Sequence, residues 1–159
     1  MARSLVDTNI LIYSSDLNEP VKRTRAIEGI DQLGAGGELV LSAQCLDEFS
    51  SASLRRGTPI TEVRVAVSVW HDLGDVLPLT GSATTAALTA VERYRLSFWD
   101  ALIWATARDA GVPVVLSEDF QDGQEIEGVR FVNPFNRPDV RRFRKSFQLP
   151  IVCQDHRVE

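Results

Sequence analysis

Short apolar runs separated by stretches of helical periodicity constrain this chain more than any other feature of its sequence. Five runs are predicted as buried strands, at residues 4–6, 39–41, 76–79, 112–116 and 129–132. Helical patterns fill the intervals between the first four runs. The last of these patterns, residues 97–107, is apolar nearly all round, as in a helix buried between a sheet and another layer. Strands that alternate with helices predict βαβ units, and therefore an α/β fold with a parallel sheet covered on both faces.

Composition fits one domain with an ordinary core. The chain has 159 residues, of which 44% are hydrophobic, and this excludes a disordered, coiled-coil or fibrous protein. The net charge is −5, so the chain as a whole does not attract a polyanion. Residues 136–159 nevertheless hold six basic and three acidic side chains, so the acidic excess belongs to the preceding residues.

The sequence also predicts where the protein resides. Cys45 and Cys153 match neither a metal-binding spacing nor the disulfide framework of a small secreted domain, which favours reduced thiols. The N-terminus has no signal-peptide pattern, and no apolar run approaches the roughly 20 residues of a membrane span. We therefore expect a cytoplasmic protein without a membrane partner.

Four acidic residues are predicted at one edge of the sheet. Asp7 directly follows the first strand, and Asp119 follows the fourth. Glu48 lies in the second turn of the helix after the second strand, and Asp100 lies in the first turn of the helix that leads into the fourth. Ligands of open parallel sheets bind where the strands end at their carboxyl termini. This edge is therefore the expected site.

Each of these acids also has a purely structural interpretation. Asp7 could cap the following helix, and Asp100 could form a capping box with Ser97. Asp119 could make an Asx turn, and Glu48 could be solvated helix surface. Four independent coincidences at the same edge are less plausible than one shared site.

Carboxylates gathered in a crevice repel one another, and protonation or a bound cation must relieve that repulsion. No cluster of histidines accompanies these acids in the sequence, so the donor atoms are oxygens. An all-oxygen donor set suits a hard, partly hydrated, octahedral ion, and we expect Mg²⁺ or Mn²⁺. Such an ion commonly acts on phosphate.

The acids lie in four short segments. These are Val6-Asp7-Thr8-Asn9-Ile10-Leu11, the helix around Glu48, Phe98-Trp99-Asp100-Ala101-Leu102-Ile103 and Leu116-Ser117-Glu118-Asp119. With the terminal Asn133-Pro134-Phe135, they resemble the PIN-domain ribonucleases, and most closely the VapC-type toxins of prokaryotic toxin–antitoxin pairs. The resemblance implies a three-layer α/β/α PIN-like fold around a parallel sheet of about four or five strands. It implies a nuclease domain over residues 1–135, followed by an Arg-rich C-terminal extension over 136–159.

By the same resemblance, the chain is a Mg²⁺- or Mn²⁺-dependent endoribonuclease. Its catalytic and metal-binding residues would be the four acids, which hold the metal directly or through water: Asp7, Glu48, Asp100 and Asp119. Thr8, Asn9 and Ser117 would orient those carboxylates or a water. Asp122 is an extra acid, which leaves open whether Asp119 alone or both acids serve a second metal position. Glu118 is expected to point away.

The resemblance further implies an RNA substrate, an antitoxin partner and a homodimer. Two alternatives remain open, a non-catalytic PIN fold used for binding or scaffolding and a housekeeping RNA-processing nuclease. No RNA-binding residue is assigned among the basic clusters at 22–25, 55–56 and 93–95, and the stretch 137–145 is the best candidate for RNA contact. The three tryptophans, Trp70, Trp99 and Trp104, could be interface anchors, but aromatic residues at helical spacing are more often core residues, and we expect them in the core.

Overall fold

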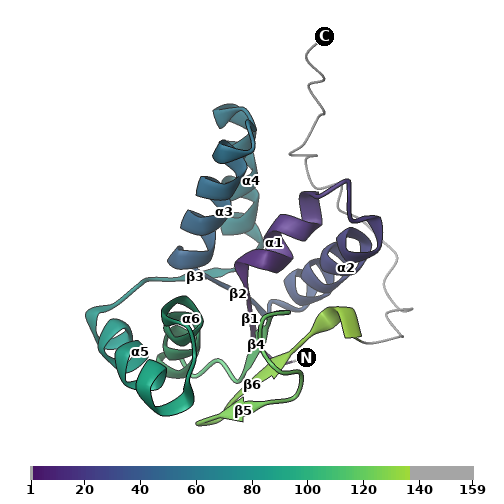
Figure 1. The fold of residues 1–159 in the computed structure, drawn as a ribbon. Coiled ribbons are helices and arrows are strands. Elements are labelled where there is room, and N and C mark those ends of the chain that lie inside the picture. The colour runs from purple at the N-terminus through teal and green to yellow at the C-terminus, as the bar shows by residue number, and fades with distance from the viewer. Residues whose placement is uncertain (1, 137–159) are drawn as a thin grey trace.

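Six α-helices and six strands alternate along residues 2–136, the part of the chain that the computed structural model describes (Figure 1). The strands are β1 (Ser4–Val6), β2 (Leu39–Ser42), β3 (Asp75–Leu77), β4 (Val114–Leu116), β5 (Glu125–Ile126) and β6 (Val129–Val132). The helices are α1 (Thr8–Ser15), α2 (Pro20–Gly36), α3 (Ala43–Arg55), α4 (Ile60–Leu73), α5 (Gly81–Tyr94) and α6 (Phe98–Asp109), and a short 3-10 turn, η1 (Pro134–Asn136), follows β6.

All six strands form one sheet in the order β3-β2-β1-β4-β6-β5. Neighbouring strands from β3 to β6 in this order are parallel, and β1 lies between β2 and β4, with Leu5 opposite Val40 on one side and Val115 on the other. Because β1, β2 and β4 are parallel neighbours, their carboxyl ends lie side by side. The topology thus brings together segments more than a hundred residues apart in the chain.

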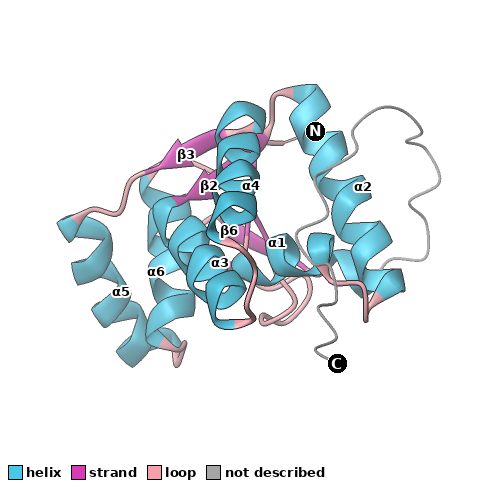
Figure 2. Cartoon of the chain, turned by 90° about the horizontal axis from the view of Figure 1, so that it is seen from above, coloured by secondary structure: helices cyan, strands magenta, loops and turns pink. Residues whose placement is uncertain are grey.

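The helices cover both faces of the sheet. From β1 to β3 the chain moves toward one edge, so right-handed crossovers place α1 to α4 on one face. It then crosses back from β3 to β4, which places α5 and α6 together on the opposite face (Figure 2). This confirms the expected three-layer α/β/α fold.

Helix boundaries follow local capping chemistry. The hydroxyls of Ser42, Thr80 and Ser97 each accept a hydrogen bond from the backbone N–H three residues later, at the starts of α3, α5 and α6. Gly37 ends α2 in the left-handed conformation, with φ of 67°. Ser97 and Asp7, both given a capping role from the sequence, do cap α6 and α1.

The expected strand number and pure parallel pairing need one correction. The sheet has six strands, because β5 pairs antiparallel with β6 through a two-residue turn. Both turn residues, Glu127 and Gly128, have positive φ, at 47° and 82°, as a tight hairpin requires. The indole N–H of Trp104 donates to the Ile126 carbonyl at 3.1 Å and ties this edge to α6.

The core lies on both faces of the sheet. In α6, every residue from Ala101 to Ala107 is buried, as its apolar sequence predicts. Trp70 and Trp104 are 3% and 2% exposed, as expected for core residues. Trp99 is 59% exposed, so its assignment to the core is wrong, because its position in the first turn of α6 directs it out of the packed interior.

The cysteines, the C-terminal extension and the membrane prediction can be compared with the described residues. Cys45 is a free, buried thiol, while Cys153 lies outside the described residues. The Arg-rich extension, except Asn136, also lies outside the described residues, and so does the candidate stretch for RNA contact at 137–145. None of the described helices combines the length and apolar character needed to cross a bilayer.

Candidate active site

Asp7 lies at the junction of β1 and α1, where three neighbours hold its carboxylate. Its Oδ1 accepts from the Thr8 backbone N–H at 2.6 Å, which caps α1. Its Oδ2 accepts from the Ser117 hydroxyl at 2.6 Å and from the Asn9 side-chain amide at 3.2 Å. Burial, reinforced by the charges of two nearby acids, raises the pKa of Asp7 to about 6 despite these hydrogen bonds. Asp7 is thus both a helix cap and a buried acid.

Glu48 reaches the same region from the second turn of α3. Its Oε2 accepts from the Thr8 hydroxyl at 2.8 Å, and its Oε1 accepts from the Gln44 side-chain amide at 3.0 Å. Each carboxylate oxygen is therefore fixed by one donor. Glu48 is half-buried and is not the freely solvated surface residue that its neighbour Asp47 is.

Asp100 and Asp119 complete the set from the other side. Asp100 lies in the first turn of α6, where the Ser97 hydroxyl accepts from its backbone N–H at 3.2 Å. Burial, followed by the charges of Asp119 and Glu48, raises the pKa of Asp100. Asp119 follows β4 and accepts from the Asn9 side-chain amide at 3.0 Å, so Asn9 bridges it to Asp7.

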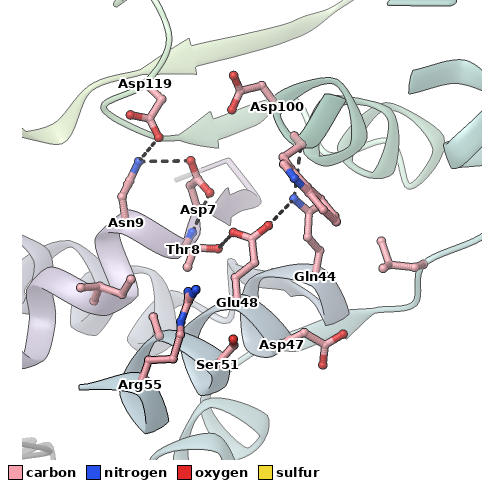
Figure 3. A pocket seen from close by; sticks show the side chains of 14 residues that line it. Asp7, Thr8, Asn9, Gln44, Asp47, Glu48, Ser51, Arg55, Asp100 and Asp119 are labelled. Carbon is pink, nitrogen blue, oxygen red and sulfur yellow. Dashed lines mark hydrogen bonds between the residues drawn. The ribbon is translucent and has the colours of Figure 1, made fainter. Parts of the chain in front are cut away.

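One open cavity of about 820 Å³ joins these residues. Figure 3 shows the four carboxylates converging on it from the β1–α1 junction, α3, α6 and the loop after β4. Its lining residues are Asp7, Thr8, Asn9, Ile12, Gln44, Asp47, Glu48, Ser51, Ala52, Arg55, Leu79, Trp99, Asp100 and Asp119. We call this cavity the acidic pocket. The four acids predicted at one sheet edge do meet there.

Two further acids near the end of β4 do not line the acidic pocket. Glu118 turns away, as expected, and accepts hydrogen bonds from the Tyr13 hydroxyl and the Lys22 ammonium. Asp122 accepts from the Asn133 backbone N–H at 2.9 Å and so closes its own loop. Of the two acids left open as second metal positions, the structure therefore places only Asp119 at the pocket.

A family model, "PIN domain", matches residues 4–121. The chain belongs to the PIN domain family. The match contains the four predicted acids, Asp7, Glu48, Asp100 and Asp119, and ends just before Asp122. No curated protein sequence matches the chain.

Solved structures share the fold of this PIN domain over most of its length. A toxin–antitoxin complex from Klebsiella pneumoniae is 20% identical, with a TM-score of 0.62, and the match covers 82% of this chain and 97% of that chain. VapBC2 from Rickettsia felis, bound to a DNA fragment from its promoter, is 12% identical, with a TM-score of 0.60 and coverage of 80% and 96%. VapC20 from Mycobacterium tuberculosis, a sarcin–ricin loop cleaving toxin, is 20% identical, with a TM-score of 0.55 and coverage of 73% and 91%.

Eight of the fourteen lining residues were not among the predicted site residues of this PIN domain, among them Gln44, Arg55 and Trp99. Gln44 and Arg55 come from α3, and Trp99 comes from α6. For α3 a signal exists, because positions 44, 48, 51 and 55 share one helix face, and all four line the pocket. For Trp99 the only signal is its place next to Asp100.

The pocket fits a hydrated hard cation. Its donor atoms are oxygens, which favour Mg²⁺ or Mn²⁺ over softer metals. Within residues 2–136, no three acidic, histidine or cysteine side chains are grouped closely enough to hold one ion together. Mg²⁺ usually keeps several waters and is bound through one or two carboxylates. Separated carboxylates around an open cavity are therefore compatible with such an ion.

Proposed function

We propose that this PIN domain is a Mg²⁺- or Mn²⁺-dependent endoribonuclease that acts as the toxin of a toxin–antitoxin pair. The observation that carries the proposal is the convergence of four carboxylates on one pocket. Among the described residues, none of the four forms an ion pair with a lysine, arginine or histidine. Their charge is thus available to an external cation.

In this proposal the four acids, Asp7, Glu48, Asp100 and Asp119, hold the metal directly or through water. When bound, the ion would lower the pKa of a water and offset charge on the phosphodiester. The surrounding residues keep the carboxylates oriented: Ser117 fixes Oδ2 of Asp7 and the backbone N–H of Asp119, and Thr8 fixes Oε2 of Glu48. Asn9 bridges Asp7 and Asp119, which sets the separation of these two acids.

Hydrolysis by an external water determines the products. In the proposed reaction, water attacks the phosphorus, the bond from phosphorus to the 3′-oxygen breaks, and the 3′-oxygen leaves with a proton, which gives a 5′-phosphate and a 3′-hydroxyl. Attack by the ribose 2′-hydroxyl would instead give a cyclic phosphate. None of the pocket residues is a histidine, the side chain that most often serves as a general acid or base.

The structural neighbours support the biological part of the proposal. Two of them are described as toxin–antitoxin or VapBC complexes, and one is described as an RNA-loop cleaving toxin. These descriptions support an antitoxin partner. That this antitoxin covers the acidic pocket, and that the chain forms a homodimer, is what the resemblance to VapC-type toxins implies.

The test is RNA cleavage by the purified chain, free of its partner, with Mg²⁺, with Mn²⁺ and with EDTA. We expect cleavage only with metal, and loss of cleavage in Asp7→Asn and in Asp100→Asn. Asp122→Asn is the matched control, because this acid lies outside the pocket and should leave cleavage unchanged. End-group analysis should find 5′-phosphates.

Three outcomes would count against the proposal. Equal cleavage by the wild type and both variants would refute the assigned site, and a cyclic phosphate product would refute the water mechanism. Absence of cleavage by the partner-free wild type would favour a scaffold. Whether the neighbouring reading frame encodes a short antitoxin-like protein separates a toxin from a housekeeping nuclease.

A further inference from the structure

We infer that the acidic pocket takes an unstacked nucleotide of single-stranded RNA, with its base against the Trp99 indole and a phosphate at Arg55. The inference rests on the proposed function and deepens it, because it names the side chains that bind the base and the phosphate. It depends on two pocket walls that the four acids do not form.

Trp99 forms an exposed aromatic wall of the pocket. Its exposed fraction is 59%, against 3% for Trp70 and 2% for Trp104. It packs against Phe98 in an edge-type contact, with ring centroids 5.4 Å apart and an interplanar angle of 69°, and it lines the acidic pocket. An exposed indole beside four carboxylates has no packing role comparable to that of the two buried tryptophans, and it offers a ring face to a ligand.

The backbone at Trp99 is fixed relative to the acids. The Gln44 side-chain amide donates to the Trp99 carbonyl at 3.2 Å and to Oε1 of Glu48 at 3.0 Å. Gln44 is only 4% exposed, so this link between α3 and α6 is shielded from water. One buried amide therefore holds the aromatic wall in register with the carboxylate of Glu48.

Arg55 lines the pocket from the last turn of α3. Figure 3 shows its side chain directed from α3 toward the carboxylates, on the same helix face as Glu48 and Ser51. Among the described residues Arg55 forms no ion pair, whereas the adjacent Arg56 lies 3.9 Å from Asp16. A guanidinium donates to phosphate oxygens through a planar fork, which makes Arg55 the phosphate-binding group of this pocket.

Single-stranded RNA fits this combination better than a duplex. Stacking on an aromatic side chain requires a base whose face is free, and in a duplex that face is covered by neighbouring bases. The cavity of about 820 Å³ lies in the size range of small-ligand sites and so has room for a nucleotide. A protein partner could also bury Trp99. The indole and the Arg55 guanidinium, however, share one cavity with the acids, which suits a base joined to a phosphate.

The experiment measures binding separately from cleavage. All binding measurements use protein that carries Asp100→Asn, so that the RNA is not cut. A short, fluorescently labelled oligouridine is titrated with this protein in Mg²⁺, and fluorescence anisotropy gives the dissociation constant. Trp99→Ala should weaken binding about tenfold, while Trp99→Phe, which keeps a ring, should retain most of it. Leu88→Ala is the matched control, because Leu88 is also 59% exposed and lies on α5 outside the pocket. A duplex of the same length should bind weakly and should be insensitive to Trp99→Ala.

The phosphate contact is tested through salt dependence. Arg55→Ala should weaken binding and lower the slope of log affinity against log salt by about one, whereas Arg56→Ala, its neighbour outside the pocket, should not change the slope. Trp99→Ala should weaken binding without changing that slope. The two walls therefore have different signatures.

Unchanged oligouridine binding by Trp99→Ala would overturn the inference, and so would equal binding of duplex and single strand. A change in the molar mass of the protein in solution, with unchanged RNA binding, would assign Trp99 to a protein interface and also overturn it. The outcome is separable from that of the proposed function. If the chain binds oligouridine through Trp99 but never cleaves RNA, the inference holds and the proposed nuclease function is refuted. If the chain cleaves RNA but its binding does not depend on Trp99, only the inference is refuted.

Discussion

Glu118 and Asp119 are adjacent in the chain, yet they lie in two regions that treat negative charge in opposite ways. Glu118 faces Lys22, whose ammonium lies 2.7 Å from its carboxylate and 4.2 Å from the centre of the Tyr13 ring. Burial opposes ionisation of Glu118, but the hydrogen bonds from Lys22 and Tyr13 prevail and lower its pKa. Asp119 faces the acidic pocket, where burial and neighbouring carboxylates raise the pKa of Asp7 and of Asp100.

This difference distinguishes an acid with a structural role from acids that form a candidate metal-binding site. Where a carboxylate only joins α2 to the loop after β4, the chain supplies its own cation, Lys22. Where four carboxylates converge, the described residues supply no ion pair, and the repulsion persists until a proton or an external cation relieves it. The net charge of −5 averages over both regions and distinguishes neither.

The largest expected effect compares the two adjacent acids directly. Asp119→Asn should slow single-turnover RNA cleavage in Mg²⁺ by about a thousandfold, which corresponds to about 4 kcal/mol of transition-state stabilisation. Glu118→Gln should leave the rate nearly unchanged, because its carboxylate pairs with Lys22 outside the pocket. Similar losses in both variants would show that the two regions are not functionally distinct.

A second prediction concerns pH and the stability of the metal-free chain. The pKa of Asp7 rises from 3.8 to about 6 on folding, so protonated Asp7 favours the folded state. Its contribution is fully present below pH 4 and is lost as the pH rises through 6, which lowers the free energy of unfolding by at most about 3 kcal/mol. Urea denaturation in EDTA between pH 4 and 7 measures it. Asp7→Asn should flatten that dependence, and an unchanged slope in this variant would assign the effect to other groups.

The smallest effect should come from the paired region. Lys22→Met keeps an apolar side chain near Tyr13 and Phe135 but removes the ion pair to Glu118. The side chains of Lys22 and Glu118 are 31% and 23% exposed. Because water screens such a pair, we expect the free energy of unfolding at pH 7 to fall by less than about 1 kcal/mol. The pH dependence has the opposite sign to that of Asp7: a lowered pKa stabilises at neutral pH, and this contribution is lost as the pH falls through the acidic range. Thermal denaturation at pH 7 and pH 4 checks both statements.

Much of the fold and the convergence of the acids could be predicted because they depend on long-range patterns. Buried strands read from runs such as Leu39 to Leu41 recur in the structure as β2, and parallel pairing then fixes which strand ends meet. The positions of Asp7 and Asp119 follow from that topology alone. The metal and the catalytic roles of these acids stay predictions.

The β5–β6 hairpin and the exposure of Trp99 could not be predicted, because they depend on local backbone and side-chain orientation that the hydrophobic pattern does not specify. β5 has only two residues and shows no periodicity, and its turn, Glu127-Gly128, lacks the Asn or Asp that usually announces such a hairpin. Trp99 was expected in the core because aromatic residues at helical spacing are more often core residues. A rotation of one residue, about 100° on a helix, separates the half-buried ring of Phe98 from the exposed ring of Trp99.

The two edge strands of the sheet limit how this molecule can associate. β3 has three residues and β5 has two, so either edge offers few backbone groups for another strand to extend. A continuous sheet shared between two chains is therefore disfavoured. Within residues 2–136, helices and side chains therefore offer more surface to a copy or a partner than the edges of the sheet do.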